Sequence, residues 1–409
     1  MGVLGGPEWG CSVDTHFWGK GETFPATDTC YSFYTHSPWH LVHIAYRSII
    51  GRLLAQLASA NNNWAFFFTQ IEVVRSSIES LTITMTMTTT PDAIPVIDLS
   101  DDSPKNCKRL IEAAIKSGCL FLKNHLLEED EIDKLFDISS QFFRLPTEVK
   151  NQYPITNKNA GYVAPFVEDL QEDGTGAGDD KEAFNMCRIN LSTFYPDQNL
   201  PQVFAENMPF ISFCMRKHYV MLHMICRMLA QGLEVKDNRG FLDPYFFASA
   251  HALDHPSHST MRFIHYSKHD ESYENVNLTG AHTDYGSITL ILQRPQNGLQ
   301  IFDGSKWKSV EVPLDENGKQ MLVVNISDIL SFWTDGLLKS VLHRVRTTSE
   351  RDSIVFFCHP ADDVLLVPVN SELVKSYNGK CFSLNKNGLP LTALDHLRLR
   401  LNEGYKRKD

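Results

Sequence analysis

Two histidines and one aspartate have the side-chain types and the spacing to bind a transition metal. His282 and Asp284 are two residues apart, so on an extended strand both side chains project from the same face. His343 lies in a separate valine-rich run, where it shares a strand face with Val341 and Val345. An imidazole among inward-facing valines needs a polar partner. We therefore predict that His282, Asp284 and His343 converge on a metal ion.

The residue types leave two metals open. Two imidazoles and one carboxylate on one side of a metal leave the opposite positions free, which suits iron(II) that must bind a co-substrate and dioxygen together. The same three side chains and one water would also satisfy zinc. A His-x-Asp triplet alone is common by chance, so the valine-faced strand of His343 carries much of the prediction.

A second group of residues predicts a site for a carboxylate ligand. Arg351, Ser353, Val355 and Phe357 share one face of a predicted strand. An arginine that points the same way as valine and phenylalanine is costly to bury unless an anion meets it. Its planar fork pairs with a carboxylate, and the Ser353 hydroxyl adds a donor. Tyr266 is a further candidate donor. A structural salt bridge for Arg351 and a core position for Tyr266 are the alternatives.

The elements that must position these residues change character along the chain. From about residue 261 to 369, short alternating segments are separated by turn residues, which is typical of an antiparallel barrel or jelly roll. Helical periodicity dominates the region before it. We expect strands at 94–99 and 119–123, helices at 103–118, 128–144, 209–232 (beyond Pro209) and 392–402, and a flexible loop at 168–180.

This pattern predicts four regions. They are an N-terminal extension at 1–86, a helical region at 87–250 that contributes strands to the barrel, a jelly-roll core at 251–369, and a C-terminal helix with a basic tail at 370–409. The extension is rich in aromatic, serine, threonine and asparagine residues, and only 40–60 has the periodicity of a short amphipathic helix. Three interpretations of this extension compete: a disordered segment, an organelle-targeting segment, and sequence upstream of a true start at Met85 or Met87. We favour the last, because its acidic residues argue against targeting.

Composition indicates a soluble globular protein and argues against nucleic acid as a partner. The hydrophobic share of 43% is ordinary for a globular protein, and the net charge of −11 disfavours nucleic acid. The nine cysteines include no Cys-x-x-Cys pair, which favours a reducing compartment. No apolar run is long enough to cross a bilayer, and no secretory signal opens the chain. We expect a cytoplasmic protein with a small-molecule partner, without nucleic acid or membrane partners; the oligomeric state is not predicted.

Several segments together resemble one family of enzymes. Roughly residues 93–365 resemble the iron(II)/2-oxoglutarate-dependent oxygenases, in the branch that includes isopenicillin N synthase and the plant flavonoid and gibberellin oxidases. The shared segments are Ile94–Leu99, Gly118, Asn124-His125, Gly161-Tyr162, Lys181–Phe184, His282-Thr283-Asp284, Gly298-Leu299-Gln300, Trp307, Asn325–Asp328, Trp333–Gly336, Lys339-Ser340, His343-Arg344-Val345 and Arg351-x-Ser353. Residues 1–86 have no counterpart.

The resemblance implies a fold, a set of cofactors and a reaction. The fold is mainly β with flanking helices, an isopenicillin N synthase-like double-stranded β-helix, or jelly roll. Fe(2+) would be bound by the two histidines and the aspartate. The distal carboxylate of 2-oxoglutarate would lie on Arg351 and Ser353, with Tyr266 near the co-substrate. With O2, such a dioxygenase converts 2-oxoglutarate into succinate and CO2 and oxidises its substrate by hydroxylation, desaturation or cyclisation.

The substrate and two rival functions stay open at this point. Phe166, Phe184, Phe302 and Phe332 are candidate pocket walls, each with a core position as the alternative. An aromatic cavity would suit a small organic molecule such as a secondary metabolite. One rival is an isopenicillin N synthase-like iron oxidase that does not use 2-oxoglutarate. The other is a non-catalytic metal-containing jelly-roll protein that binds a ligand.

Overall fold

The computed structural model describes residues 93–404, except 171–177, 188, 191–192, 253–254, 275, 380, 382–383 and 385–386. The chain divides into two units, Met1–Thr88 and Thr89–Asp409. All the described residues belong to the second unit. The predictions for residues 1–86, including the helix at 40–60, therefore lie outside the described residues.

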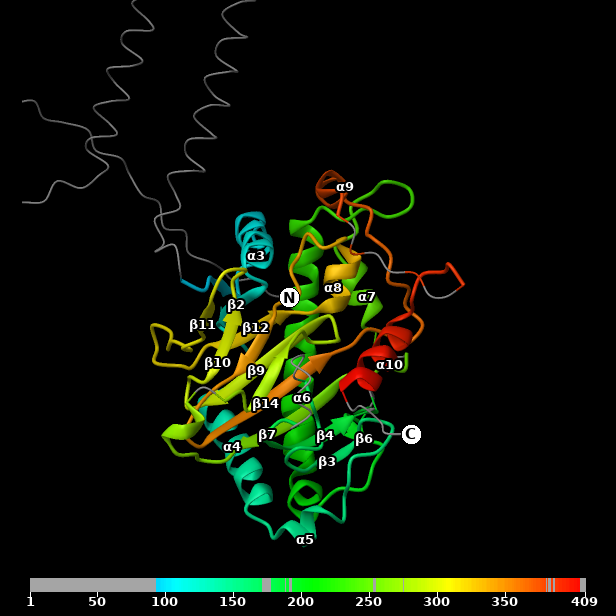
Figure 1. Ribbon diagram of the computed structural model, residues 1–409. Coiled ribbons are helices and arrows are strands. Elements are labelled where there is room, and N and C mark those ends of the chain that lie inside the picture. The colour runs from blue at the N-terminus through cyan, green and yellow to red at the C-terminus, as the bar shows by residue number, and fades with distance from the viewer. Residues whose placement is uncertain are drawn as a thin grey trace, which may run out of the picture. The chain divides into compact units, whose positions relative to one another are not determined.

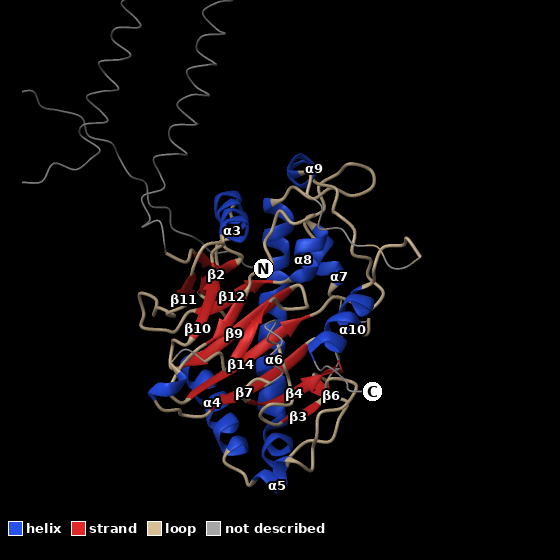
Figure 2. Ribbon diagram, in the orientation of Figure 1, coloured by secondary structure: helices blue, strands red, loops and turns tan. Residues whose placement is uncertain are grey.

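The larger sheet of the described chain contains eight strands and runs across the molecule (Figures 1 and 2). Apart from the parallel pair β1 and β2, its neighbouring strands are antiparallel. The strands in order across this major sheet are β1 (Val96–Asp98), β2 (Cys119–Lys123), β12 (Leu322–Ile326), β9 (Ile288–Arg294), β14 (Arg351–Cys358), β7 (Thr260–Tyr266), β4 (Glu182–Cys187) and β3 (Gly161–Val163).

A second, smaller sheet packs against the major sheet. Its antiparallel strands are β11 (Trp307–Ser309), β10 (Leu299–Phe302), β13 (His343–Val345) and β8 (Thr279–His282). Ile264 and Ile291 of the major sheet belong to the same buried apolar cluster as Leu299 and Val345 of this minor sheet. Two facing sheets with a shared core form the predicted jelly roll. Separately, β5 (Ile189–Asn190) pairs with β6 (Tyr195–Pro196).

Helices pack against the other face of the major sheet. The long helix α6 runs behind β9, β14 and β7 in Figure 1, and its apolar side joins one buried cluster with residues of the sheet. None of the described helices is long and apolar enough to span a membrane. The helices are α3 (Pro104–Lys116), α4 (Glu129–Phe143), α5 (Thr147–Lys150), α6 (Gln202–Gly232), α7 (Phe246–Ala250), η1 (Glu271–Tyr273), α8 (Asp328–Trp333), α9 (Glu372–Tyr377) and α10 (Ala393–Gly404).

Local signals predicted the starts of α3 and α4, but not the start of α6. Ser103 accepts a hydrogen bond from the backbone N–H of Asn106 and starts α3, as expected for an N-cap serine followed by proline. The prediction that the long apolar helix starts beyond Pro209 is wrong, because α6 begins seven residues earlier, at Gln202. A proline removes only one helix hydrogen bond, and the fully buried Phe204 holds the first turns against the core.

Candidate metal centre and ligand cavities

The three predicted metal ligands converge at the edge of the minor sheet. His282 ends β8 and lies opposite His343, the first residue of β13, so the two imidazole rings are 4.3 Å apart between centroids. The Nε2 atoms of His282 and His343 lie 3.8 and 3.6 Å from Oδ1 of Asp284. One ligand atom from each side chain lies within 4.8 Å of the others. We call these three residues the metal triad.

The hydrogen bonds of the metal triad fit a divalent cation. Nδ1 of His282 is bound to the carbonyl of Gly280 at 2.8 Å, and Nδ1 of His343 to the carbonyl of Val341 at 3.0 Å. These bonds turn both Nε2 atoms toward Asp284, and holding one ring nitrogen is typical of metal-binding histidines. Burial and the neighbouring His343 keep the pKa of His282 well below its usual range, so the imidazole is neutral. Oδ2 of Asp284 is buried without a described hydrogen-bond partner, which a cation would correct.

The turn that carries Asp284 is held by backbone contacts from two other elements. The N–H groups of Asp328 and Ile329, at the start of α8, donate to the carbonyls of Asp284 and Gly286 at 3.0 and 2.9 Å. A Cβ at Gly286 would lie 2.3 Å from the carbonyl oxygen of Cys358. Only glycine therefore allows β14 to approach this turn so closely.

Arg351 is buried without an acidic partner among the described residues. It is 2% exposed, and burial lowers the pKa of its guanidinium. Its Nη2 donates to the side-chain oxygen of Gln293 at 2.8 Å, its Nε to the carbonyl of Asn297 at 3.0 Å and its Nη1 to the Ser353 hydroxyl at 3.2 Å. All of these acceptors are neutral. The structural salt bridge considered as the alternative is therefore not formed, and the positive charge is available to an anion.

Tyr266 lies beside this arginine. The Arg351 guanidinium lies 5.0 Å from the centre of the Tyr266 ring, and the Tyr266 hydroxyl is 2.9 Å from the Thr279 hydroxyl. A Cβ at Gly298, which has φ +92°, would lie 2.9 Å from Cδ of Arg351, so glycine leaves room for the arginine. We call Arg351, Ser353 and Tyr266 the carboxylate site.

A single cavity, the co-substrate cavity, connects the carboxylate site with the metal triad. Strand alternation builds it. On β7, Ile264 and Tyr266 face the cavity, whereas Phe263 faces the helices. On β14, Val355 faces the cavity and Phe356 faces the helices. The metal site and the anion site thus open into one space.

Four buried charged residues next to this cavity were not predicted. We call them the charged network: Glu168, Asp179, Lys181 and Arg262. Arg262 donates two hydrogen bonds to the Glu168 carboxylate, at 3.2 and 2.7 Å. Lys181 lies 3.0 Å from Glu168 and also binds Asp179. Burial alone would raise the pKa of Glu168, but Arg262 and Lys181 hold it well below its usual range.

The charged network supports the metal triad through the backbone. Asp179 accepts a hydrogen bond from the N–H of Gly280 at 3.0 Å, and the carbonyl of Gly280 holds Nδ1 of His282. Part of this network could have been found in the sequence, because Arg262 shares a strand face with Ile264 and Tyr266. Its partners come from a loop, whose contacts no strand spacing predicts.

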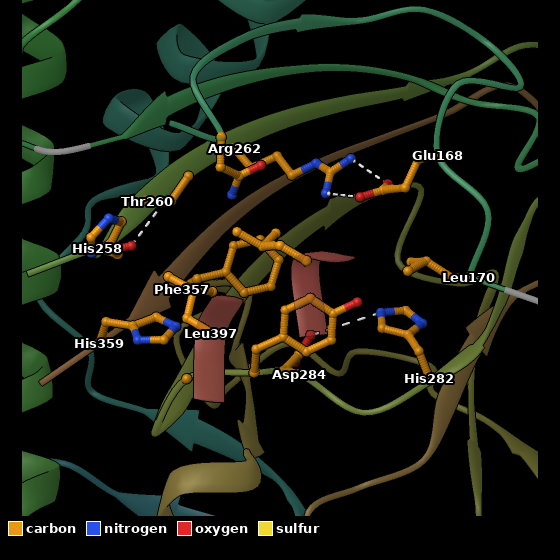
Figure 3. A pocket seen from close by; sticks show the side chains of 14 residues that line it. Glu168, Leu170, His258, Thr260, Arg262, His282, Asp284, Phe357, His359 and Leu397 are labelled. Atoms are coloured by element: carbon orange, nitrogen blue, oxygen red, sulfur yellow. Dashed lines mark hydrogen bonds and ion pairs between the residues drawn. The ribbon is translucent and has the colours of Figure 1, made fainter. Parts of the chain in front are cut away.

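A second cavity, which we call the substrate cavity, is lined by His282 and Asp284 of the metal triad (Figure 3). It shares Leu170, Arg262, His282, Asp284 and Phe357 with the co-substrate cavity. Its other lining residues are Asn159, Glu168, His258, Thr260, Tyr285, Gly286, His359, Leu397 and Leu401. The last two come from α10, so the C-terminal helix forms one wall.

None of the four predicted phenylalanine walls lines either cavity. Phe184 is fully buried among the helix-facing aromatic rings, because its neighbour Ala183 occupies the inward side of β4. Phe166 is 56% exposed. Phe302 packs against Trp307, and Phe332 against His396. The aromatic walls come instead from Phe357 and Tyr285.

Comparison with known proteins supports one family. Residues 94–203 match the N-terminal family described as non-haem dioxygenase in morphine synthesis, and residues 257–360 match the 2OG-Fe(II) oxygenase superfamily. A UPF0676 protein of Schizosaccharomyces pombe is 33% identical over 296 residues, which cover 68% of this chain and 85% of that protein. The 2-oxoglutarate-dependent dioxygenase gloE of Glarea lozoyensis is 28% identical, with 68% and 82% covered.

Solved structures show the same fold. A full-length protein of Neurospora crassa, in complex with alpha-KG and 5-formyluracil, has a TM-score of 0.61 and 22% identity, and the match covers 77% of this chain and 98% of that one. These relatives favour the predicted dioxygenase over both alternatives. The chain belongs to the 2OG-Fe(II) oxygenase superfamily, and it is a 2-oxoglutarate-dependent dioxygenase that uses Fe(2+), 2-oxoglutarate and O2 to oxidise a small molecule.

Proposed function

We propose that the metal triad holds the iron of this dioxygenase and that the carboxylate site holds 2-oxoglutarate. The observation that carries the proposal is the co-substrate cavity, which is lined both by Arg351, a buried cation without an acidic partner among the described residues, and by Asp284, a buried carboxylate whose Oδ2 has no described hydrogen-bond partner. A dicarboxylate that spans this space would meet a cation at each end. Hydrogen bonds from Arg351 to one carboxylate then orient the co-substrate, with Ser353 and Tyr266 as neighbouring polar groups.

The remaining residues position the reactants and exclude water. When bound with its co-substrate and O2, the iron supplies the oxidant that attacks a C–H bond. The charged network fixes the strand that carries His282 through Gly280. Leu170 and Phe357 contribute to both cavities, and their apolar side chains would limit the access of water to the metal.

The proposed substrate is a small organic molecule, and the proposed location is the cytosol. The net charge of −11 supports a small molecule rather than a nucleic acid. The structure of the same Neurospora crassa protein with thymine is one example of a small molecule held on this fold. Every described cysteine is a free thiol, which supports a reducing compartment.

Succinate release by the iron-loaded enzyme tests these assignments. We expect 2-oxoglutarate to be converted to succinate in amounts that rise when an accepted small molecule is added. An oxidase that does not use 2-oxoglutarate would consume O2 without releasing succinate. A non-catalytic protein would bind iron and release no succinate with any candidate substrate. Either result would overturn the proposed roles.

A further inference from the structure

A buried histidine in the substrate cavity has no hydrogen-bond partner for its ring in the described part of the chain. His359 is 4% exposed, and its hydrogen bonds to described residues are made by its backbone. Its ring nitrogens are not among the fully enclosed atoms that lack a partner, so they face the cavity that the side chain lines. A neutral imidazole offers one donor and one acceptor.

The backbone around His359 fixes the direction of the ring. Its N–H donates to the Ser259 hydroxyl at 3.0 Å, and the same hydroxyl donates to its carbonyl at 3.2 Å. His359 follows β14 and continues the inward face that Phe357 occupies two residues earlier. On its other side, a Cβ at Gly286 would lie 3.2 Å from Cδ2 of the ring. The imidazole is therefore held against the turn that carries Asp284.

The part of the cavity around His359 is suited to a neutral group. Burial and the neighbouring His258 lower the pKa of His359 to about 3, so the ring is neutral near pH 7. Other charged side chains of the lining are already paired: Glu168 and Arg262 bind each other at 2.7 Å. Asp284 belongs to the metal triad. A charged substrate group would find no free opposite charge among these lining residues.

We propose that His359 is a specificity-determining residue that hydrogen-bonds a hydroxyl or carbonyl oxygen of the substrate. Figure 3 shows His359 on the opposite side of the cavity from His282, with the apolar Phe357 and Leu397 between them. The substrate class is therefore a molecule with an apolar body, an oxidisable C–H bond at the metal end and a neutral oxygen at the other end. This inference rests on the proposed roles of the metal triad and the carboxylate site.

Matched probes that differ in one substituent test this inference. The first set is 4-methylphenol, toluene and 4-methylbenzoate, and the second is 6-methyl-2-naphthol, 2-methylnaphthalene and 6-methyl-2-naphthoate. Each has a methyl C–H bond opposite a hydroxyl, a hydrogen or a carboxylate. Probe-dependent succinate release is measured with the iron-loaded full chain and saturating 2-oxoglutarate. We expect kcat/KM to be about tenfold higher for the hydroxyl probe than for its partners in at least one set, because the polar ring is otherwise left unpaired.

Two variants separate recognition from a structural role. His359→Leu should remove the preference for the hydroxyl probe, and His359→Gln should keep part of it. Both should bind 2-oxoglutarate as tightly as the unmodified enzyme does, because His359 does not line the co-substrate cavity. The Tm of His359→Leu should not fall, because the ring makes no hydrogen bond to a described residue that could be lost. His223→Leu is the control, since that half-buried ring binds the carbonyl of His251 outside the cavity.

The outcomes are distinguishable. A hydroxyl preference that persists in His359→Leu overturns the proposal, as does an unmodified enzyme that accepts none of the six probes or prefers the carboxylates. A fall in Tm with equal losses for all probes would assign His359 a structural role and also overturn it. If the unmodified enzyme neither binds 2-oxoglutarate nor releases succinate, the failure lies in the proposed roles of the two sites, and the inference falls with them.

Discussion

Asp284 is a buried carboxylate that lacks a described partner for one oxygen, and a bound cation would supply one. It is 4% exposed, and Oδ2 has no described hydrogen-bond partner. A buried charged group in this state destabilises the metal-free fold. Arg351 is the complementary case, a buried cation with neutral acceptors and an open cavity beside it. Each residue has an unpaired buried charge that destabilises the unliganded protein, and ligand binding would remove this unfavourable free energy. Substitutions at them should therefore affect ligand binding more than folding.

Asp284→Ala should abolish iron binding and turnover while the fold is kept. Since the substitution removes an unpaired buried charge, the Tm of the metal-free variant should be equal to or higher than that of the unmodified protein. Added Fe(2+) should raise the Tm of the unmodified protein under anaerobic conditions but not that of the variant. Anaerobic thermal melting and succinate release check both points. Near-normal turnover in the variant would rule out the metal triad.

Arg351→Lys should raise the KM for 2-oxoglutarate strongly, because lysine keeps the charge but loses the fork. Arg351→Ala should be worse, by about a hundredfold or more, since an uncompensated buried charge costs roughly 3–5 kcal/mol. Iron binding without co-substrate should change little. Arg344→Lys is a matched control, because Arg344 stacks on Trp307 and lines neither cavity. An unaltered KM with a lowered Tm would instead mean a structural arginine.

At the scale of elements, the two faces of β7 and β14 have different roles: one carries the carboxylate site, and the other carries a stabilising hydrogen bond. On the inward face, β7 and β14 carry Tyr266 and Arg351, which lie directly opposite each other in the strand register. The next pair along, His265 and Asp352, faces outward and forms a hydrogen bond of 2.8 Å. The outward pair ties together the strand ends that hold the carboxylate site. On the side of the metal triad, helix α10 contacts the turn between His282 and Asp284 through Arg400.

The outward pair should make stability depend on pH in a definite direction. Burial alone would lower the pKa of His265, but the hydrogen bond and charge of Asp352 raise it above its usual value. The stabilisation is therefore complete below the unfolded pKa of about 6.5 and is lost as pH rises through the higher folded value. His265→Gln should lower the free energy of unfolding by about 1 kcal/mol at pH 6, with a smaller effect at pH 9. Urea unfolding at both values measures this, and a pH-independent difference would contradict it.

Helix α10 should influence iron affinity through Arg400. Its guanidinium donates to the Thr283 hydroxyl at 3.3 Å, between the two ligands of the turn, and lies over the Tyr285 ring. Arg400→Ala should weaken iron binding about tenfold, as is usual when residues that orient metal ligands are lost. The control is Arg398→Ala on the same helix, whose side chain is exposed. Anaerobic Fe(2+) titration compares them, and equal affinities would show that α10 does not hold the turn.

At the scale of the whole molecule, every residue assigned to the two cavities lies within the described chain from residue 93 onward. Both sheets of the jelly roll, the metal triad and the helices that cover the major sheet belong to one compact unit, Thr89–Asp409. The two core clusters are also made from residues of this unit. The described core and both cavities are therefore built from this unit.

A chain that begins at Met87 should consequently fold and turn over like the full chain. Its Tm should lie within a few degrees of the full-length value, and the KM for 2-oxoglutarate should be the same, because every candidate ligand and core strand of the described residues lies after residue 92 and is kept. Circular dichroism melting and succinate release provide the comparison. Insolubility or loss of turnover in the shortened protein would show that residues 1–86 contribute to the fold.

Much of the metal and anion chemistry was determined by the sequence, because it depends on short spacings. Residues two apart on a strand share a face whatever the rest of the chain does. This rule is enough to pair His282 with Asp284 and Arg351 with Ser353. Helix starts such as Ser103 were predictable for the same reason, since an N-cap is satisfied within a few residues. Family resemblance then specified the jelly roll.

Tertiary structure alone decided what surrounds those residues. Whether Phe184 faces the cavity or the helices depends on the register of β4 beside β7, and the sequence of β4 places apolar residues on both faces of the strand. The partner of Arg262 comes from a residue 94 positions away, and the wall formed by Leu397 comes from a distant helix. Nothing in the sequence distinguishes His359 from the other histidines. Its burial without a described ring partner results from the packing of the surrounding elements. These features depend on packing between segments far apart in the chain, which no local pattern encodes.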